Sequence, residues 1–214
     1  MREVKGKRRY DSRLRADRAR ETRLRLVEAA RGLFLQDGYQ ATTVANVAAS
    51  VGVSVETVYK AFGGKPGLVQ AIAEAALAGV GPVPAETRSN ELHLAESDPC
   101  AIIRGWGRLT CEVAPRIAPV LLLVRDASAD PEMATLKTTL EAQRQLRMTD
   151  NARSLAEGDH LRADITVEYA SDVLWTYSSP ELYELLVIKR HWSVERYGDF
   201  VAEAMIAALL PPPA

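Results

Sequence analysis

The sequence has few cysteines and no long apolar run. Its two cysteines, Cys100 and Cys111, stand in apolar stretches without a CxxC pair or a histidine cluster. Neither a zinc site nor a disulfide framework is indicated, so we expect two buried thiols, no metal and no other cofactor. No segment reaches the roughly 18 to 20 apolar residues of a membrane span, because the best candidate, 71–83, is interrupted by Glu74. The basic N-terminus is not followed by the apolar run of a secretory signal, so we expect a cytoplasmic protein without a membrane partner.

The sequence also lacks a recognisable set of catalytic groups. Its three histidines, His93, His160 and His191, stand in unrelated contexts, and no nucleophile is paired with a base. The Gly63-Gly64-Lys65 triplet lacks the preceding strand and the flanking spacing of a phosphate-binding loop. We therefore expect that the protein is not an enzyme. Demonstrated turnover of any small molecule would contradict this expectation.

The charge of the chain is distributed unevenly. With 47% hydrophobic and 26% charged residues, the 214 residues suit a soluble globular protein of one or two domains. Residues 1–68 carry 14 Lys and Arg against 7 Asp and Glu, a balance of +7, whereas the remainder carries 13 against 21, a balance of −8. This asymmetry indicates that the N-terminal part binds a polyanion.

The positive surplus is concentrated before Leu26. It consists of Arg2, Lys5, Lys7, Arg8, Arg9, Arg13, Arg15, Arg18, Arg20, Arg23 and Arg25. Residues 1–15 show no apolar periodicity, so we expect a flexible basic arm. Such an arm can enter a DNA minor groove beside a helix-turn-helix, and it can equally remain a disordered, solvated tail.

The segment TVANVAASVGVSVETVYKAFGGK, residues 43–65, predicts two short helices joined by a tight turn at Gly52. Thr43 and Ser54 are each placed to cap the start of one helix. The first helix is expected to bury Val44, Val47 and Ala48, and the second to pack through Val55, Val58 and Phe62. Two short packed helices of this kind form a helix-turn-helix.

The second of these helices presents a short polar surface of the size that enters a major groove. Glutamate can accept from cytosine N4 and lysine can donate to guanine, so several of its residues are candidates for base reading. Glu56 can instead serve only to complement the helix dipole. The candidates for base reading are Val55, Glu56, Thr57 and Lys60.

The rest of the chain also predicts helices, and no strand signal competes with them. A first helix from Asp17 should end at Gly38, and another should span 64–79. Residues 84–97 read as a loop or a frayed helix end. Asp98-Pro99, Asp130-Pro131 and Ser179-Pro180 resemble helix starts, as do Thr166 and Ser193, which predicts helices near 98–113, 116–128, 131–156, 166–178, 180–190 and 193–210.

These elements predict an all-α fold of about 9–10 helices. We expect a basic arm at 1–15, a three-helix DNA-binding domain at 16–63, a connecting helix at 64–82 and a second domain at 83–210.

The same residues resemble the TetR family of transcriptional regulators. The resemblance is sharpest between Arg23 and Leu68 and rests on Ala29-Ala30, Leu33-Phe34, Gly38-Tyr39, Thr42-Thr43-Val44, Val47-Ala48, Val51-Gly52-Val53-Ser54, Thr57-Val58-Tyr59, Phe62 and Lys65. Further along, Leu161-Arg162, Trp175, Ser179-Pro180-Glu181-Leu182-Tyr183 and Trp192-Ser193 resemble a regulatory domain found in some members. His191 stands where that pattern has glycine.

The resemblance implies a ligand-responsive repressor that binds a near-palindromic, double-stranded operator as a homodimer. The spacing of Tyr59 from Val58 and Phe62 turns it outward, and the resemblance implies that Tyr59 and Lys65 contact the DNA backbone, although Tyr59 can be a core aromatic and Lys65 a solvated surface lysine. Thr43 can donate to a phosphate as well as cap its helix, and Ser54 lies at the DNA-binding surface. The resemblance also implies a C-terminal helical bundle that binds a small effector and dimerises. Two further functions remain open: a regulator without a natural effector, and non-specific binding to nucleic acid driven by the arm alone.

The resemblance places an effector cavity and a dimer interface in the C-terminal domain. The candidate cavity residues are mostly apolar, which favours an apolar or aromatic effector. Each of them can instead be an ordinary core residue. The candidates are Trp106, Leu109, Thr110, Val113, Leu121, Leu122, Met148, Trp175 and Tyr177. Candidate interface residues form one stripe on the last helix, although this stripe can also pack within its own subunit: Tyr197, Phe200, Val201, Ala204, Met205 and Ala208.

Overall fold

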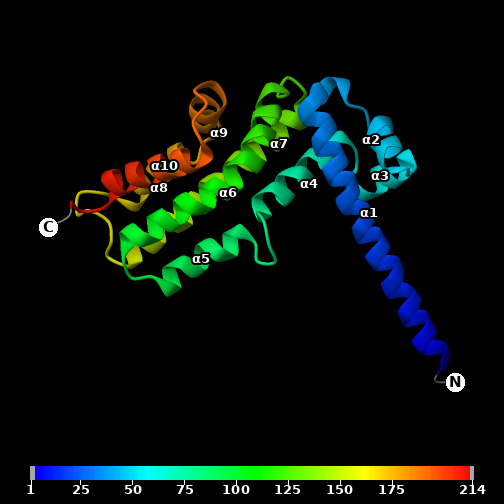
Figure 1. Ribbon diagram of the computed structural model, residues 1–214, viewed down its shortest axis with the longest axis horizontal. Coiled ribbons are helices and arrows are strands. Elements are labelled where there is room, and N and C mark those ends of the chain that lie inside the picture. Colours follow the sequence, from blue (N-terminus) through cyan, green and yellow to red (C-terminus); the bar gives the residue numbers. More distant parts are fainter. Residues whose placement is uncertain (1–2, 213–214) are drawn as a thin grey trace. The chain divides into compact units, whose positions relative to one another are not determined.

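The protein is described by a computed structural model that covers the backbone of residues 3–212 and the side chains of residues 16–212. The described part contains helices and no strand (Figure 1). The helices are α1 (Glu3–Ala41), α2 (Val44–Val51), α3 (Val55–Phe62), α4 (Lys65–Ala78), α5 (Ala85–Ala95), α6 (Pro99–Asp126), α7 (Pro131–Glu157), α8 (Val167–Tyr177), α9 (Pro180–Tyr183), a π-helix (Glu184–Lys189) and α10 (Val194–Leu209). The all-α class is confirmed. None of the described helices combines the length and the apolar character that a bilayer crossing requires.

The chain divides into two compact units, Met1–Ile72 and Ala73–Ala214. In the first unit, α2 and α3 lie beside the C-terminal part of α1 (Figure 1). Leu26, Ala30 and Phe34 of α1 are buried, as their spacing predicts. Helical geometry breaks at Gly38, whose φ of 82° is left-handed, and the expected end of the first helix is thereby confirmed.

The N-terminal end of α1 differs from expectation. A flexible basic arm is expected over residues 1–15 and a helix only from Asp17, whereas the backbone is helical from Glu3 onward. The absence of an apolar stripe argues only that this segment has no packed face, since Arg, Lys and Glu are good helix formers. Residues 1–2 lie outside the described part of the chain.

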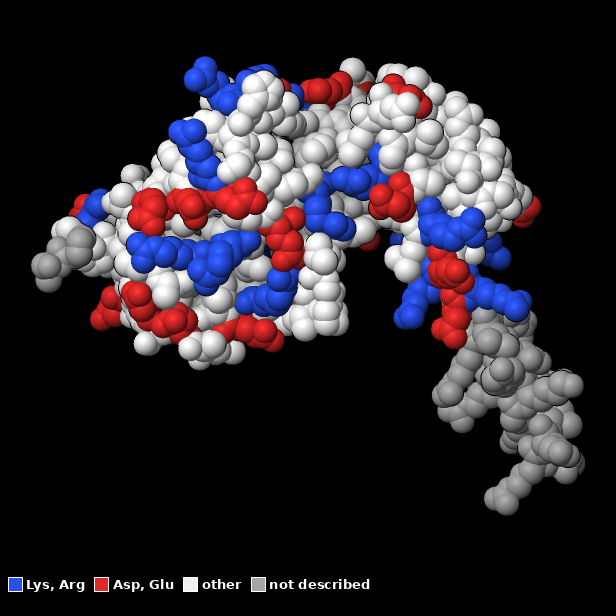
Figure 2. All heavy atoms as spheres, viewed as in Figure 1, with Lys and Arg blue, Asp and Glu red and all other residues white. Residues whose placement is uncertain are grey.

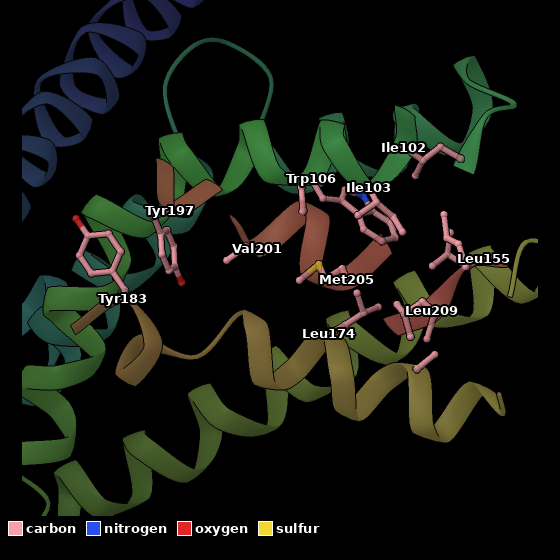
Figure 3. Close-up of a cluster of buried hydrophobic side chains, with 14 of the residues drawn as sticks. Ile102, Ile103, Trp106, Leu155, Leu174, Tyr183, Tyr197, Val201, Met205 and Leu209 are labelled. Atoms are coloured by element: carbon pink, nitrogen blue, oxygen red, sulfur yellow. The ribbon is translucent and has the colours of Figure 1, made fainter. Parts of the chain in front are cut away.

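In the second unit, the core forms where α6, α8 and α10 meet, with α7 beside them. Figure 3 shows Trp106 and Ile103 of α6 pointing toward Met205 of α10, with Leu174 of α8 below them. Tyr183 and Tyr197 meet edge to face with their ring centroids 5.4 Å apart. Burial raises the pKa of the Tyr197 hydroxyl, so it stays neutral.

Helices α6 and α10 cross through a pair of glycines, Gly107 and Gly198. A Cβ at Gly198 would lie 2.2 Å from the sulfur of Cys111 and 2.8 Å from the carbonyl oxygen of Gly107. A Cβ at Gly107 would lie 2.9 Å from the Gly198 oxygen. The backbones therefore approach each other as closely as they do because neither position carries a side chain.

Most helix starts lie where the capping residues place them. Side-chain oxygens of Asp98, Asp130, Thr166, Ser179 and Ser193 accept backbone N–H groups of the first turns of α6, α7, α8, α9 and α10. Each cap satisfies a donor that has no partner inside its helix, and three of the five are followed by a proline at the first helical position.

Two predictions for the second unit were wrong. The two helices expected at 98–113 and 116–128 are one helix, α6, which continues through Pro115 and Pro119. The segment 84–97, expected to be a loop or a frayed helix end, contains the eleven-residue helix α5. The helix expected at 180–190 is present over Pro180–Lys189, as one turn of α-helix followed by the π-helix over Glu184–Lys189.

Glu112 of α6 ties the chain after α4 to α5. Its carboxylate accepts hydrogen bonds from Arg88 Nη1 at 2.8 Å and Nη2 at 2.6 Å, and also from the backbone N–H of Val80. These donors hold the pKa of Glu112 at about 2.

Candidate nucleic-acid interface

Both predicted caps of the helix-turn-helix are formed. The hydroxyl oxygen of Thr43 accepts from the N–H of Asn46 at 3.1 Å, and that of Ser54 accepts from the N–H of Thr57 at 3.2 Å. Gly52 adopts a φ of 75°, the left-handed conformation that the turn between the two helices requires. The side chains of Thr43 and Ser54 are exposed, so capping leaves one side of each accessible.

The inner face of the motif is smaller than expected. Val44, Val47 and Ala48 of α2 are buried as predicted, but in α3 only Val58 is fully buried and Phe62 is half-buried. Val55, the first residue of α3, was expected to pack inward but is 42% exposed. It therefore belongs to the outer face, where it was also a candidate for base reading.

The outer face of α3 consists of exposed side chains of Val55, Glu56, Thr57, Tyr59 and Lys60. Tyr59 is 53% exposed, which confirms that it points away from the core. The hydroxyl of Thr57 lies 2.9 Å from that of Ser54, so these two hydroxyls are already engaged with each other. Glu56 lies in the first turn, where its charge complements the positive end of the helix dipole.

Lys65 begins α4, directly after α3 and its two-glycine turn. Its ammonium lies 4.2 Å from the centroid of the Tyr39 ring, and its side chain is half-buried. The contact fixes the lysine near the C-terminal end of α3, where Gly63 and Gly64 both have positive φ.

Two residues of the first helix reach the motif in a way that the sequence did not reveal. Arg23 donates through Nη1 to the carbonyl oxygen of Ala61 at 2.9 Å, and Arg25 donates through Nη2 to that of Val51 at 3.2 Å. The acceptors are backbone atoms 38 and 26 residues away along the chain. No residue pattern signals such a contact, so both arginines were counted only with the basic surplus.

The charged side chains are interleaved where they are visible on the second unit. Figure 2 shows rows of acidic and basic side chains alternating there, with no broad field of one sign on that face. In the first unit, Arg18 and Arg20 are exposed on α1. The basic side chains of residues 2–15 lie outside the described side chains.

The candidate effector residues do not line one cavity. Trp106 belongs to the buried core, and Leu109, Met148 and Tyr177 pack against it. Leu122 is buried elsewhere on α6, Thr110 and Val113 are half-buried, and Trp175 lies under the guanidinium of Arg144 at 4.5 Å.

The described surface of the second unit has hollows that contain candidate effector residues. An open groove of about 280 Å³ between α5 and α6 is lined by Arg88, Leu92, Gly105, Arg108, Leu109 and Glu112. A space of about 30 Å³ is bordered by Leu121 and Arg144, among other residues of α6, α7 and α9. Each contains one of the apolar candidates, Leu121 or Leu109, and both are also lined by charged residues.

The candidate dimer stripe on α10 divides into two faces. Tyr197, Val201 and Met205 are buried inside the chain itself, so they are not available to a second copy; this part of the assignment is corrected. The three pack inward because they face α6 and α8 across the core. Phe200 is 39% exposed and Ala204 and Ala208 are half-buried, leaving a narrower stripe at the surface.

Comparison with known proteins gives a family match within the N-terminal part of the chain. Residues 26–72 match the model of "Bacterial regulatory proteins, tetR family". A search of curated proteins finds no match. Among solved structures, a protein of Syntrophomonas wolfei described as a TetR-family transcriptional regulator has 18% identity and a TM-score of 0.71, covering 88% of this chain and 95% of that one.

Two further solved structures have the same fold. NalD of Pseudomonas aeruginosa, the secondary repressor of the MexAB-OprM multidrug efflux pump, has 20% identity and a TM-score of 0.69, covering 92% of this chain and 100% of its own. SmeT, solved as a triclosan complex, has 17% identity and a TM-score of 0.69, covering 91% and 99%.

Residues 26–72 therefore belong to the DNA-binding domain of the tetR family of bacterial regulatory proteins, and the chain shares the fold of solved regulators of that family.

Proposed function

We propose that this regulator is a repressor that binds a near-palindromic operator as a homodimer. The observation that carries the proposal is the outer face of α3, which is exposed from Val55 to Lys60 while Val58 holds the helix from behind. A short helix supported in this way can place a few side chains against base edges. Repression is supported by the likeness to NalD, which is itself a repressor.

In the proposed complex, Lys60 and Glu56 read bases, and Tyr59 and Lys65 contact the backbone, with Thr43 and Ser54 at the helix starts. Val55 and Thr57 complete the reading surface. The proposed domains are the DNA-binding part at 16–63, the connecting helix at 64–82 and the regulatory part at 83–210, preceded by a basic segment at 1–15.

Dimerisation is proposed through the surface stripe of α10, formed by Phe200, Ala204 and Ala208, together with α8. These residues recur every fourth position, so they share one face of the helix. The alanines allow a second helix to approach closely. A twofold pair would present its two recognition helices to half-sites about 34–36 Å apart or somewhat more.

An effector is proposed to bind the second unit and to release the operator. The residues named for this role do not line one cavity in the single chain, so the likeness to SmeT, solved with triclosan, is the support for a small aromatic ligand. The ligand would act by preferring a dimer whose recognition helices are misaligned for DNA, so the coupling equals the difference in its affinity for the two states.

Selection of bound duplexes from randomised DNA tests the function. We expect an enriched near-palindrome, which full-length protein prefers to random DNA by at least about a thousandfold. A Lys60→Ala variant should bind the enriched sequence less tightly than the wild type. Recovery of no preferred sequence would contradict the proposal and favour non-specific binding by the basic segment.

Thermal shift with triclosan as the probe tests the effector class. A rise in melting temperature together with loss of operator binding supports an apolar effector. If triclosan and a panel of neutral aromatic compounds change neither quantity, the assignment of an apolar effector is wrong.

A further inference from the structure

Two arginines near the end of the basic run turn back onto the helix-turn-helix. Arg23 donates to the carbonyl of Ala61 at 2.9 Å, and its guanidinium lies 4.4 Å from the centroid of the Phe62 ring. Arg25 donates to the carbonyl of Val51 at 3.2 Å. Val51 ends α2 and Ala61 lies in the last turn of α3. The last carbonyls of a helix have no partner within it, so each arginine caps the C-terminal end of one helix.

The recognition helix needs an anchor at this end. It has eight residues, of which only Val58 is fully buried. Its N-terminal end is fixed by the turn after α2 and the cap at Ser54, whereas its C-terminal end runs into two glycines with φ of 76° and 139°. Such a link constrains the helix weakly, because glycine has the most conformational freedom of any residue.

The contacts of Arg23 suit this task. A cation near the negative end of the helix dipole is favourable, and the planar guanidinium both donates to the carbonyl and stacks on an aromatic ring. Lysine can supply the charge but not the planar stack. The side chain therefore holds the end of α3 by geometry as well as by charge.

We propose that Arg23 and Arg25 are positioning residues that fix the ends of α3 and α2 against α1, and that they are not phosphate contacts. This rests on the proposed role of α3 in reading DNA. Loss of the Arg23 anchor lets the C-terminal end of α3 move. Base contacts then weaken, while attraction between the remaining cations and the DNA backbone persists.

The test measures affinity for the selected operator and for a random duplex of the same length, over a range of salt. We expect Arg23→Gln to lose about tenfold in operator affinity, with little change on random DNA and an unchanged salt slope. Arg23→Lys keeps the charge and should be impaired nearly as much. The matched control is Arg20→Gln, since Arg20 is exposed on the same helix and has no partner among the described side chains; it should keep the wild-type ratio of the two affinities.

A phosphate contact predicts different results. Arg23→Gln would then weaken both duplexes and lower the salt slope by about 0.9 per subunit, and Arg23→Lys would restore both. Either outcome would overturn the proposal. It would also be overturned if Arg20→Gln lowered the ratio of operator affinity to random-duplex affinity as much as Arg23→Gln does.

Hydrogen exchange provides a readout without DNA. In folded Arg23→Gln, amides of residues 59–68 should exchange faster than in the wild type, while those of 26–34 in α1 should not change. Unchanged exchange at 59–68 would contradict an anchoring role. If the selection enriches no operator, the proposed function fails, and this measurement still tests Arg23 by itself.

Discussion

His191 has a φ of 56°, in the left-handed region that glycine adopts without steric cost. The residue lies between the π-helix and α10, at the position where the family pattern has glycine. For residues other than glycine this conformation costs about 1–2 kcal/mol. Replacement by glycine removes this strain, but it also increases the conformational freedom of the unfolded chain, which cancels part of the gain in stability. We predict that His191→Gly raises the free energy of unfolding by up to about 1 kcal/mol, measured by urea denaturation.

The neighbouring Arg190 provides the control for this prediction. It is also exposed, but its φ of −98° lies in an ordinary region. Arg190→Gly should therefore destabilise the protein slightly, because it gains only unfolded-state freedom. Equal effects of the two substitutions would show that backbone strain at residue 191 does not limit stability.

The pKa of Glu112 gives a second prediction at this scale. In the unfolded chain a glutamate has a pKa of about 4.3, whereas here Arg88 and the Val80 N–H hold the pKa of Glu112 at about 2. Its contribution is therefore fully present above about pH 4.5 and falls as the pH drops toward 2. Solvent screening limits it, so Glu112→Gln should cost about 1 kcal/mol at pH 7.

Urea denaturation at several pH values checks this prediction. The difference between wild type and Glu112→Gln should shrink between pH 5 and pH 3. The control is Glu203→Gln, because Glu203 pairs with Arg104 at 2.9 Å but both side chains are more than half exposed. It should show little effect at any pH, and a constant difference for Glu112→Gln would refute the assignment.

Local side-chain chemistry made several residue roles predictable. The caps at Thr43 and Ser54 and the left-handed turn at Gly52 depend on neighbours within three or four residues, so the sequence contains all the information. The contacts of Arg23 and Arg25 depend on backbone atoms brought near only by the fold. Because donor and acceptor are 38 and 26 residues apart along the chain, no local sequence pattern identifies these contacts.

At the scale of elements, the crossing of α6 and α10 depends on Gly107 and Gly198. A methyl group at Gly198 would meet the Cys111 sulfur at 2.2 Å and the Gly107 oxygen at 2.8 Å, so the two helices would have to separate. We predict that Gly198→Ala lowers the free energy of unfolding by about 1–3 kcal/mol, as measured by chemical denaturation.

The same substitution in α1 is the matched control. A Cβ at Gly32 would meet nothing within 4 Å, so Gly32→Ala should stabilise the protein by about 0.5–1 kcal/mol through helix propensity alone. If the free energy of unfolding falls in Gly198→Ala and rises in Gly32→Ala, the effect of close packing at Gly198 is distinguished from that of helix propensity. A Gly198→Ala protein as stable as the wild type would contradict the close crossing.

Helix boundaries were predictable where caps mark them and less so where packing decides. Pro115 and Pro119 each lack an N–H, which locally favours a break, yet α6 continues through them because its residues on both sides are buried against other helices. The segment containing α5 shows weak periodicity because only Ala85 and Ser89 are fully buried. Its position depends instead on Leu92, which fills the space beside Gly105 of α6.

At the scale of the molecule, the position of the core decided which sequence assignments were correct. An apolar stripe shows that a helix is covered, but it does not show by what. Tyr197, Val201 and Met205 are covered by their own chain, so only the edge of the stripe is left for a partner. The effector residues present the same ambiguity, because residues that fill a core and residues that line a cavity have the same composition.

The exposed edge of α10 gives the last prediction. Phe200 contacts Trp192 and Tyr177, with ring centroids 5.5 and 6.3 Å apart, and remains 39% exposed in the single chain. If this aromatic cluster is covered by a second copy, a charge there would be buried without a partner and the dimer would dissociate. We predict that wild type sediments at twice the 23.4 kDa chain mass and Phe200→Glu at the chain mass. Monomers bind each half-site singly, so operator affinity should fall at least about tenfold.

Leu94→Glu is the control for this prediction. Leu94 is 89% exposed on α5, so this variant should keep the mass of the wild type. A wild-type monomer at micromolar concentration, or a dimeric and folded Phe200→Glu, would show that this face is not the interface.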